Sequence, residues 1–168
     1  KIVTPDIRFR IDKASEEVNI NPTDAQKKAG NYAKGHIKFD GFDISIENPK
    51  GSTRSGVDQD GNKWSNQMGA DYGYIKGTVG KDKDHIDVFI GDKPELNKVY
   101  VVDQINPKTG AFDEHKVMLG FDGVTEARKA YQASYPKDWK GLNNITRTTK
   151  EGLKDWFENG NTKKEFAD

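Results

Sequence analysis

The organisation of the chain follows from one stretch, YGYIKGTVGKDKDHIDVFI, which runs from Tyr72 to Ile90. Its two ends are rich in aromatic, β-branched and other apolar residues, which is typical of strands, and its glycine-flanked middle is typical of a turn. The pattern therefore predicts two strands joined by a polar loop. Asp82 and Asp84 lie in the predicted loop, and Asp87 interrupts the apolar strand that follows it.

Three carboxylates that converge at one end of a sheet repel one another unless cations lie between them. Carboxylate oxygens with no cysteine nearby suit Mg²⁺ or Mn²⁺ better than zinc. The alternative is a solvated hairpin, because Asp, Lys and Gly are common turn residues. Asp87 favours the metal site, since a carboxylate within an otherwise apolar strand is costly to bury without a partner.

The same stretch resembles the signature of the family I soluble inorganic pyrophosphatases. The resemblance consists of Tyr-Gly-Tyr-Ile, two further residues, Thr, and then Asp-x-Asp-x-x-Asp-Val. The sequence departs from the family pattern at His85, where the family usually has Pro. The resemblance implies a mainly β (α+β) fold, a small OB-like five-stranded barrel with flanking helices. Short strands separated by frequent turns also suit a small closed or partly closed barrel.

The resemblance further implies metal-dependent hydrolysis of inorganic pyrophosphate to two phosphates by a metal-activated water, with Mg²⁺ as cofactor and Mn²⁺ as a possible substitute. In that scheme Asp84 is the catalytic residue that accepts a proton from the attacking water. The substrate is held by Arg54, Tyr72 and Lys116. The metal ligands are Asp82, Asp87, Asp113, Glu47, Asp103 and Glu114.

Some of these positions have alternatives. Arg54 lies a residue or two closer to Glu47 than the family's lysine does, and it is either a bidentate phosphate ligand or a solvated loop residue. Lys116 matches a phosphate-binding lysine of the family, which places Glu114 on the second carboxylate of the same hairpin. Asp113 is an equally good candidate for that carboxylate by geometry.

Two other features of this region bear on the site. Asp103 matches the first carboxylate of the hairpin, and His115 is expected to point away from the site in a structural role. The family also uses a Tyr-Lys pair to hold the product phosphate, and no such dipeptide is present. Lys137 and Lys140 are the candidates to replace it.

Composition limits the partners. The 168 residues include 27 Lys+Arg and 27 Asp+Glu, so the net charge is zero and general nucleic-acid binding is not expected. The absence of cysteine excludes thiol catalysis, disulfides and zinc-thiolate sites. No apolar run approaches the length of a membrane span, and no secretion signal is evident. Pyrophosphate is the expected partner.

Three parts are expected along the chain: a lead-in or linker at 1–35, the barrel domain with its C-terminal helices at 36–158, and a polar, frayed tail at 159–168. In the lead-in, alternation at 7–11 predicts an edge strand or a linker, and Asn21-Pro22 begins a short helix that stops at Gly30. In the domain we expect strands at 36–40, 42–47, 99–104 and 112–119, a turn at 58–62 between two more strands, and helices at 121–131 and 148–157.

A wider resemblance covers most of residues 24–158. The runs ENPKGS at 47–52 and FDEHKVMLGF at 112–121 look like the pyrophosphatase-like domain of polyvalent proteins of phages and conjugative elements. That resemblance implies a piece of a larger multi-domain polypeptide, which the start at Lys1 without Met suits, acting in the cytoplasm of a bacterial host cell. Two other functions stay open: a catalytically altered barrel that binds a phosphate ligand or a protein, and a hydrolase of a larger phosphoanhydride such as a nucleotide.

Overall fold

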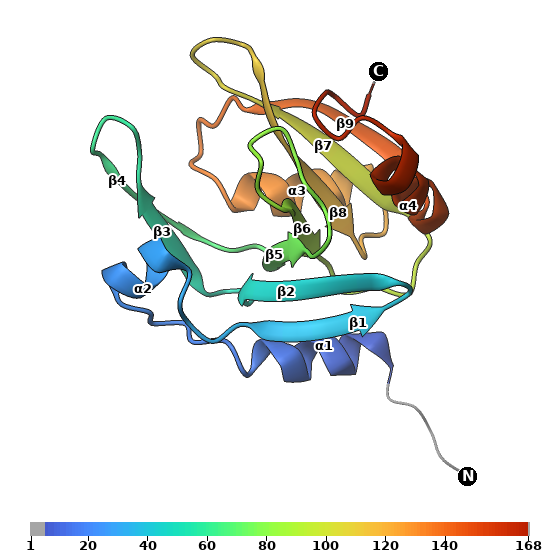
Figure 1. Cartoon of the computed structure of the whole chain (residues 1–168), viewed down its shortest axis with the longest axis horizontal. Helices are drawn as coiled ribbons and strands as arrows, with labels where there is room; N and C mark the ends of the chain where they lie inside the picture. The colour runs from blue at the N-terminus through green and yellow to red at the C-terminus, as the bar shows by residue number, and fades with distance from the viewer. Residues whose placement is uncertain (1–5, 168) are drawn as a thin grey trace.

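The computed structural model describes residues 6–167, so that residues 1–5 of the expected lead-in and Asp168 of the expected tail lie outside the described residues. Within residues 6–167, four helices flank a large sheet and a separate hairpin (Figure 1). The helices are α1 (Ile7–Ser15), α2 (Asp24–Ala29), α3 (Val124–Ala133) and α4 (Lys150–Asn159). The strands are β1 (Gly35–Phe39), β2 (Phe42–Asn48), β3 (Thr53–Val57), β4 (Lys63–Gln67), β5 (Asp71–Ile75), β6 (Ile86–Ile90), β7 (Val99–Ile105), β8 (Phe112–Leu119) and β9 (Leu142–Thr148).

The large sheet has seven strands in the order β1-β2-β5-β6-β8-β7-β9, and β3 and β4 form the two-stranded sheet. The neighbours in the large sheet are antiparallel except for the parallel pair β6 and β8. The predicted mainly β fold with flanking helices is confirmed. The predicted five-stranded OB-like barrel is not confirmed, because within residues 6–167 the sheet is open, with β1 and β9 as its two edges.

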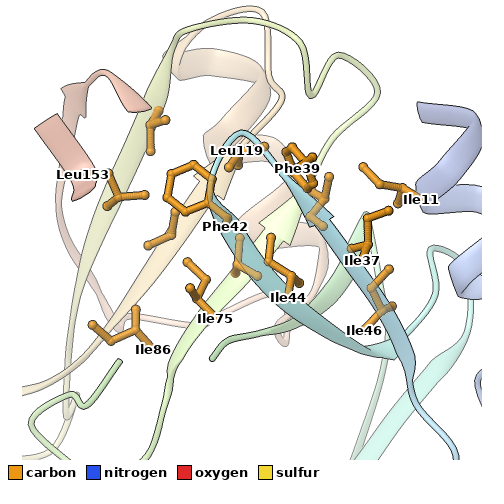
Figure 2. Packing of buried hydrophobic residues seen from close by; sticks show 14 of the residues in the cluster. Ile11, Ile37, Phe39, Phe42, Ile44, Ile46, Ile75, Ile86, Leu119 and Leu153 are labelled. Carbon is orange, nitrogen blue, oxygen red and sulfur yellow. The ribbon is translucent and has the colours of Figure 1, made fainter. Parts of the chain in front are cut away.

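Strand alternation divides the apolar core into two clusters on opposite faces of the sheet. One face carries Ile44, Val88 and Val117, and Figure 2 shows Ile11 of α1 and Leu153 of α4 on opposite sides of this cluster. The other face carries the second cluster, in which Tyr72, Phe89 and Met118 pack with Ala127 and Tyr131 of α3. Each fully buried Val, Leu, Ile, Phe or Met side chain in these clusters contributes about 1.5–3 kcal/mol to the free energy of unfolding.

The expectation of an edge strand or linker at 7–11 is wrong, because these residues begin helix α1. Asp6 caps the helix by accepting a hydrogen bond from the amide of Phe9 at 2.8 Å. The alternation in the short segment coincides with a helical stripe in which Ile11 and Ala14 lie on the buried side, and Val18 is buried just beyond the end of the helix. Arg8 then pairs with the buried Asp71 at the start of β5, so α1 is fixed to the large sheet.

The other expected elements are present with small shifts. The helix after Asn21-Pro22 begins at Asp24 instead, since Thr23 and Gln26 form a capping box, and it stops at Gly30 as expected. The hairpin of β1 and β2 and the strands around the 58–62 turn are confirmed. Strand β9 has no counterpart in the prediction, because its residues are mostly polar and only partly buried. None of the helices within 6–167 has the length and apolar character that crossing a bilayer requires.

The C-terminal segment does not fray as expected, since residues 161–167 dock on the domain. The hydroxyl of Thr162 donates a 2.6 Å hydrogen bond to the carbonyl of Val79 in the loop between β5 and β6. Phe166 packs against the ring of Trp156, with ring centroids 5.0 Å apart. The segment therefore reinforces the loop that carries Asp82 and Asp84.

Candidate active site

A cleft of about 550 Å³ gathers most of the charged side chains that the sequence singles out. It lies on the same face of the large sheet as Tyr72 and Phe89, where β6 and β8 run side by side. The predicted residues that line it are Glu47, Arg54, Asp82, Asp84, Asp87, Glu114 and Lys116. They come from β2, β3, β6, β8 and the loop at 76–85, so the fold assembles them from segments far apart in sequence.

The loop at 76–85 is held closed by the buried side chain of Thr78. Its hydroxyl donates to the carbonyl of Ile75 at 2.6 Å and accepts from the amide of Ile86 at 2.9 Å, which ties together the two strand ends. The carboxylate of Asp82 in turn accepts the amide of Asp84 at 3.1 Å. These bonds place both aspartates at the exposed mouth of the cleft.

Lys116 is the buried cation at the floor of the cleft. Its Nζ lies 2.6 Å from Asp87 Oδ2, 2.7 Å from Glu114 Oε1 and 2.8 Å from the hydroxyl of Tyr72. The Tyr72 hydroxyl also donates to Asp87 Oδ2 at 2.8 Å. Register explains the arrangement, because Asp87 pairs with Lys116 across the parallel strands and Glu114 lies two residues earlier on the same face.

These contacts change the titration of the cluster. Burial acts to raise the pKa of Asp87, but the charge of Lys116 and the hydrogen bonds with Lys116, Tyr72 and Glu114 together lower it below its ordinary value. Burial raises the pKa of Glu114, and the nearby Asp87 charge adds to the effect. The carboxylates around Lys116 hold its pKa well above its ordinary value despite burial, so it stays charged.

Arg54 is a second cation in the cleft, and it pairs with no carboxylate within 6–167. Its guanidinium lies 5.1 Å from the ring centroid of Trp64 and 4.9 Å from that of Tyr72. Neither an ion pair nor a hydrogen bond involves its guanidinium in the described part of the chain. The five N–H donors are thus positioned by two aromatic rings and remain available to an anion. This position does not fit a solvated loop residue.

Glu47 lies in the same cleft, where the charges of Arg54 and Lys34 act against the rise in its pKa. It accepts a hydrogen bond from the hydroxyl of Tyr32 at 3.3 Å. Burial raises the pKa of Glu47, and the Asp87 charge raises it further. Burial also raises the pKa of Tyr32 to about 12, so the tyrosine stays a neutral donor.

The donor chemistry of the cleft suits a hard divalent cation. In the arrangement described for residues 6–167, no three acidic or imidazole groups are already grouped as metal ligands. However, five carboxylates line one cleft: Glu47, Asp82, Asp84, Asp87 and Glu114. The raised pKa values of Glu47, Asp82 and Glu114 each include repulsion from a neighbouring carboxylate as well as burial. Such a set fits Mg²⁺ or Mn²⁺, which prefer carboxylate oxygen.

Two predicted metal ligands lie elsewhere. Asp103 is fully buried on the opposite face, where its carboxylate accepts the amides of Phe166 at 2.8 Å and Ala167 at 3.0 Å. His115, its partner across β7 and β8, contacts the carbonyl of Lys164 at 2.9 Å through Nε2, which agrees with the expected structural role. Asp113 is exposed and does not line the cleft. Side chains alternate along a strand, so Asp103 and its partner His115 share the face opposite to Glu114, whereas Asp113 lies where the pairing of β7 and β8 shifts register.

The structure also adds residues to the site that the sequence did not predict. Lys27 and Lys34 line the cleft from the segment around α2, which carries no recognisable motif. Tyr135 is partly buried, and it lies close enough to Lys116 for that ammonium to act against the rise that burial causes in the tyrosine pKa. The only hint of Tyr135 in the sequence is its Tyr-x-Lys spacing to Lys137. Lys137 and Lys140, the candidates to replace the family's Tyr-Lys pair, are both exposed, and neither lines the cleft.

Comparison with known proteins gives one match. A family model described as inorganic pyrophosphatase matches residues 24–158, which is most of the chain and includes each predicted site residue. Searches of curated proteins and of solved structures find no match. The match begins after α1, although α1 is part of the apolar core.

Proposed function

Because the chain belongs to the inorganic pyrophosphatase family, we propose that it hydrolyses inorganic pyrophosphate to two phosphates in a reaction that depends on Mg²⁺. One observation carries the proposal: Asp82, Asp84 and Asp87 line a single cleft together with the cations Arg54 and Lys116. Carboxylates can recruit divalent cations, and fixed cations can hold phosphate oxygens. Pyrophosphate needs both kinds of group, because it is small and highly charged.

The residues of the cleft have separate roles in this proposal. Arg54 and Lys116 bind phosphate oxygens. Tyr72, the third expected substrate ligand, is buried and does not line the cleft, so its hydroxyl orients the Lys116 ammonium instead. Asp82 and Asp87, with contributions from Glu47 and Glu114, would hold Mg²⁺, or Mn²⁺ in its place. When bound, the divalent ion neutralises phosphate charge and lowers the pKa of water. Asp103 and Asp113 have no part in this ligand set.

Asp84 serves as the base. Within residues 6–167 no ion pair engages its carboxylate, whereas Asp87 is held by Lys116. The water oxygen forms a bond to one phosphorus, the bond from that phosphorus to the bridging oxygen breaks, and the second phosphate leaves. The proton of the attacking water passes to Asp84. Catalysis of this kind depends on positioning and charge stabilisation more than on covalent chemistry.

The test is the release of phosphate from pyrophosphate by the wild-type chain, with Mg²⁺, with Mn²⁺ and with EDTA. We expect turnover with Mg²⁺ that EDTA abolishes. Turnover that is unchanged by EDTA would overturn the metal dependence. No turnover with either metal would overturn the proposed activity.

A second function is favoured by one observation, which is that Lys116 already forms ion pairs with both Asp87 and Glu114. A cleft that keeps this ion pair would bind a phosphate ligand through Arg54 without hydrolysing it. The phosphate-release assay distinguishes the two functions when it is combined with a calorimetric measurement of pyrophosphate binding. Tight binding without phosphate release would indicate the binding module.

The cellular setting is a separate proposal. Action in the cytoplasm of a bacterial cell, as one domain of a larger protein of a mobile element, is supported by the resemblance of 47–52 and 112–121 to such domains. Localisation of a tagged full-length protein in its bacterial host tests it. Recovery of the protein outside the cytoplasm would contradict it.

A further inference from the structure

A second cavity adjoins the cleft, and most of its lining residues have no role in the proposed pyrophosphate site. It has a volume of about 430 Å³ and lies between the segment at 19–22, the end of β2 and strand β3. The cleft and this cavity share four lining residues, which are Lys27, Tyr32, Glu47 and Arg54. Figure 1 shows the α2 segment beside the base of the β3–β4 hairpin, and Lys27 Nζ joins the two by donating to Ser55 Oγ at 2.7 Å.

The chemistry of the second cavity differs from that of the cleft. Its wall consists largely of amide and hydroxyl side chains, among them Asn21, Asn48, Thr53 and Ser55. It has one carboxylate and two cations, and all three of these are shared with the cleft. A further phosphate group in this cavity would lack the cations that it needs. An uncharged group rich in hydrogen-bonding atoms would find partners in the amide and hydroxyl side chains of the wall.

Arg54 lies where the two cavities meet. Its guanidinium is held by Trp64 and Tyr72 and donates no hydrogen bond to any residue within 6–167. It can therefore hold a phosphate group that has one neighbour in the cleft and another in the second cavity. Inorganic pyrophosphate ends at this phosphate, and a diphosphate ester continues beyond it.

We propose that the site also accepts nucleoside diphosphates, with the terminal phosphate at the carboxylates, the inner phosphate at Arg54 and the nucleoside in the second cavity. This inference rests on the proposed pyrophosphatase function. Nucleosides are uncharged and rich in hydrogen-bonding groups, as the wall of the second cavity requires, and its volume is within the usual range for small-molecule sites.

The reaction follows the same course as with pyrophosphate. The water oxygen bonds to the terminal phosphorus, and the bond between that phosphorus and the bridging oxygen breaks. Inorganic phosphate and a nucleoside monophosphate are released. Asp84 takes the proton from the attacking water, so no further reactant is needed.

The test is to fill the second cavity while leaving the cleft intact. Thr53→Trp places a large ring in it from β3, and Asn21→Trp does so from the opposite wall. Gln59→Trp is the matched control, because it adds the same ring to the exposed turn between β3 and β4. Phosphate release is measured with pyrophosphate, ADP, GDP, CDP and UDP in Mg²⁺.

We expect the wild type to hydrolyse pyrophosphate and at least one nucleoside diphosphate. Both cavity variants should lose about tenfold or more in kcat/KM for that nucleotide and stay within about twofold for pyrophosphate, with the control unchanged. Turnover of pyrophosphate with none of the four nucleotides would overturn the inference alone. No turnover of any substrate would overturn the proposed function as well.

Binding of an inert analogue separates recognition from turnover. The α,β-methylene analogue of the hydrolysed nucleoside diphosphate should inhibit pyrophosphate hydrolysis competitively, with an inhibition constant that rises about tenfold in Thr53→Trp and in Asn21→Trp. Equal inhibition of the wild type and both cavity variants would show that the nucleoside does not enter the second cavity, and would contradict the inference. If circular dichroism shows that one tryptophan variant is unfolded, the inference is tested with the other variant.

Discussion

The Nζ of Lys116 lies 2.6 Å from Asp87 Oδ2, and this ion pair is the centre of the charge balance in the cleft. The ammonium is almost fully buried and also contacts Glu114. A buried cation between two carboxylates compensates charges that would otherwise destabilise the fold. The same cation can then hold phosphate oxygens once a divalent ion neutralises the carboxylates.

Removal of this cation should therefore destabilise the chain when no metal is present. Lys116→Met leaves Asp87 and Glu114 without their ion pair, and we expect the free energy of unfolding to fall by about 3 kcal/mol in urea denaturation. Adding Asp87→Asn to the variant should restore part of the loss. A loss below about 1 kcal/mol would mean that the pair behaves as a surface ion pair.

Glu47 should have opposite effects on stability and activity. Because burial and the Asp87 charge raise its pKa in the folded state, folding favours its protonated form. Its cost to metal-free stability thus appears as pH rises above the ordinary glutamate pKa of 4.5 and is complete above the raised folded value. Glu47→Gln should remove this pH dependence, raise Tm near neutral pH and weaken Mg²⁺-dependent turnover. An unchanged Tm in EDTA would contradict this account.

The assignments of Asp103 and Glu114 can be separated by the Mg²⁺ dependence of turnover. Asp103→Asn should lower the free energy of unfolding by about 2 kcal/mol, because its two carboxylate oxygens each accept an amide of the C-terminal segment. The Mg²⁺ concentration for half-maximal turnover should not change. Glu114→Gln should raise that concentration, and Asp113→Asn is the control on the same strand. A raised Mg²⁺ requirement in Asp103→Asn would show that Asp103 is a metal ligand after all.

Arg54 should act on substrate binding through the geometry of its guanidinium. Arg54→Lys keeps the charge but loses the fork of donors and the planar group that lies over the rings of Trp64 and Tyr72. We expect KM for pyrophosphate to rise by about tenfold, with a smaller change in kcat. Arg54→Ala should raise KM for pyrophosphate more than Arg54→Lys does. A lysine variant with wild-type KM would show that the charge alone is sufficient.

The sequence predicted the parts of the fold that depend on short-range pattern. The hairpins, the strand at Val99–Ile105 and the spacing of Asp82, Asp84 and Asp87 could be predicted because alternation and turn residues are local properties. The helix at Ile7–Ser15 was missed because five residues of alternation concealed a longer helical stripe. The open seven-stranded sheet depends on pairing between distant strands, which no local pattern reveals.

The same limit applies to the site. Alternation along β7 and β8 could have shown that Asp103 and Glu114 face opposite sides of the sheet, but only once their register was known. Lys27, Lys34 and Tyr135 reach the cleft region through tertiary packing, and their local sequence has no metal or phosphate motif. The distance of Arg54 from Glu47 along the chain identifies it as a candidate, but only the structure shows its guanidinium over the rings of Trp64 and Tyr72.

The most direct test of the proposed pyrophosphatase is the steady-state rate of phosphate release from pyrophosphate in Mg²⁺ by the wild type, Asp84→Asn and Asp138→Asn. The last is a matched control, because Asp138 is exposed and does not line the cleft. We predict turnover in the wild type and in Asp138→Asn, and a loss of about a hundredfold or more in kcat in Asp84→Asn. Equal rates in all three would show that Asp84 is not the base, and no activity in any of them would contradict the proposed hydrolysis itself.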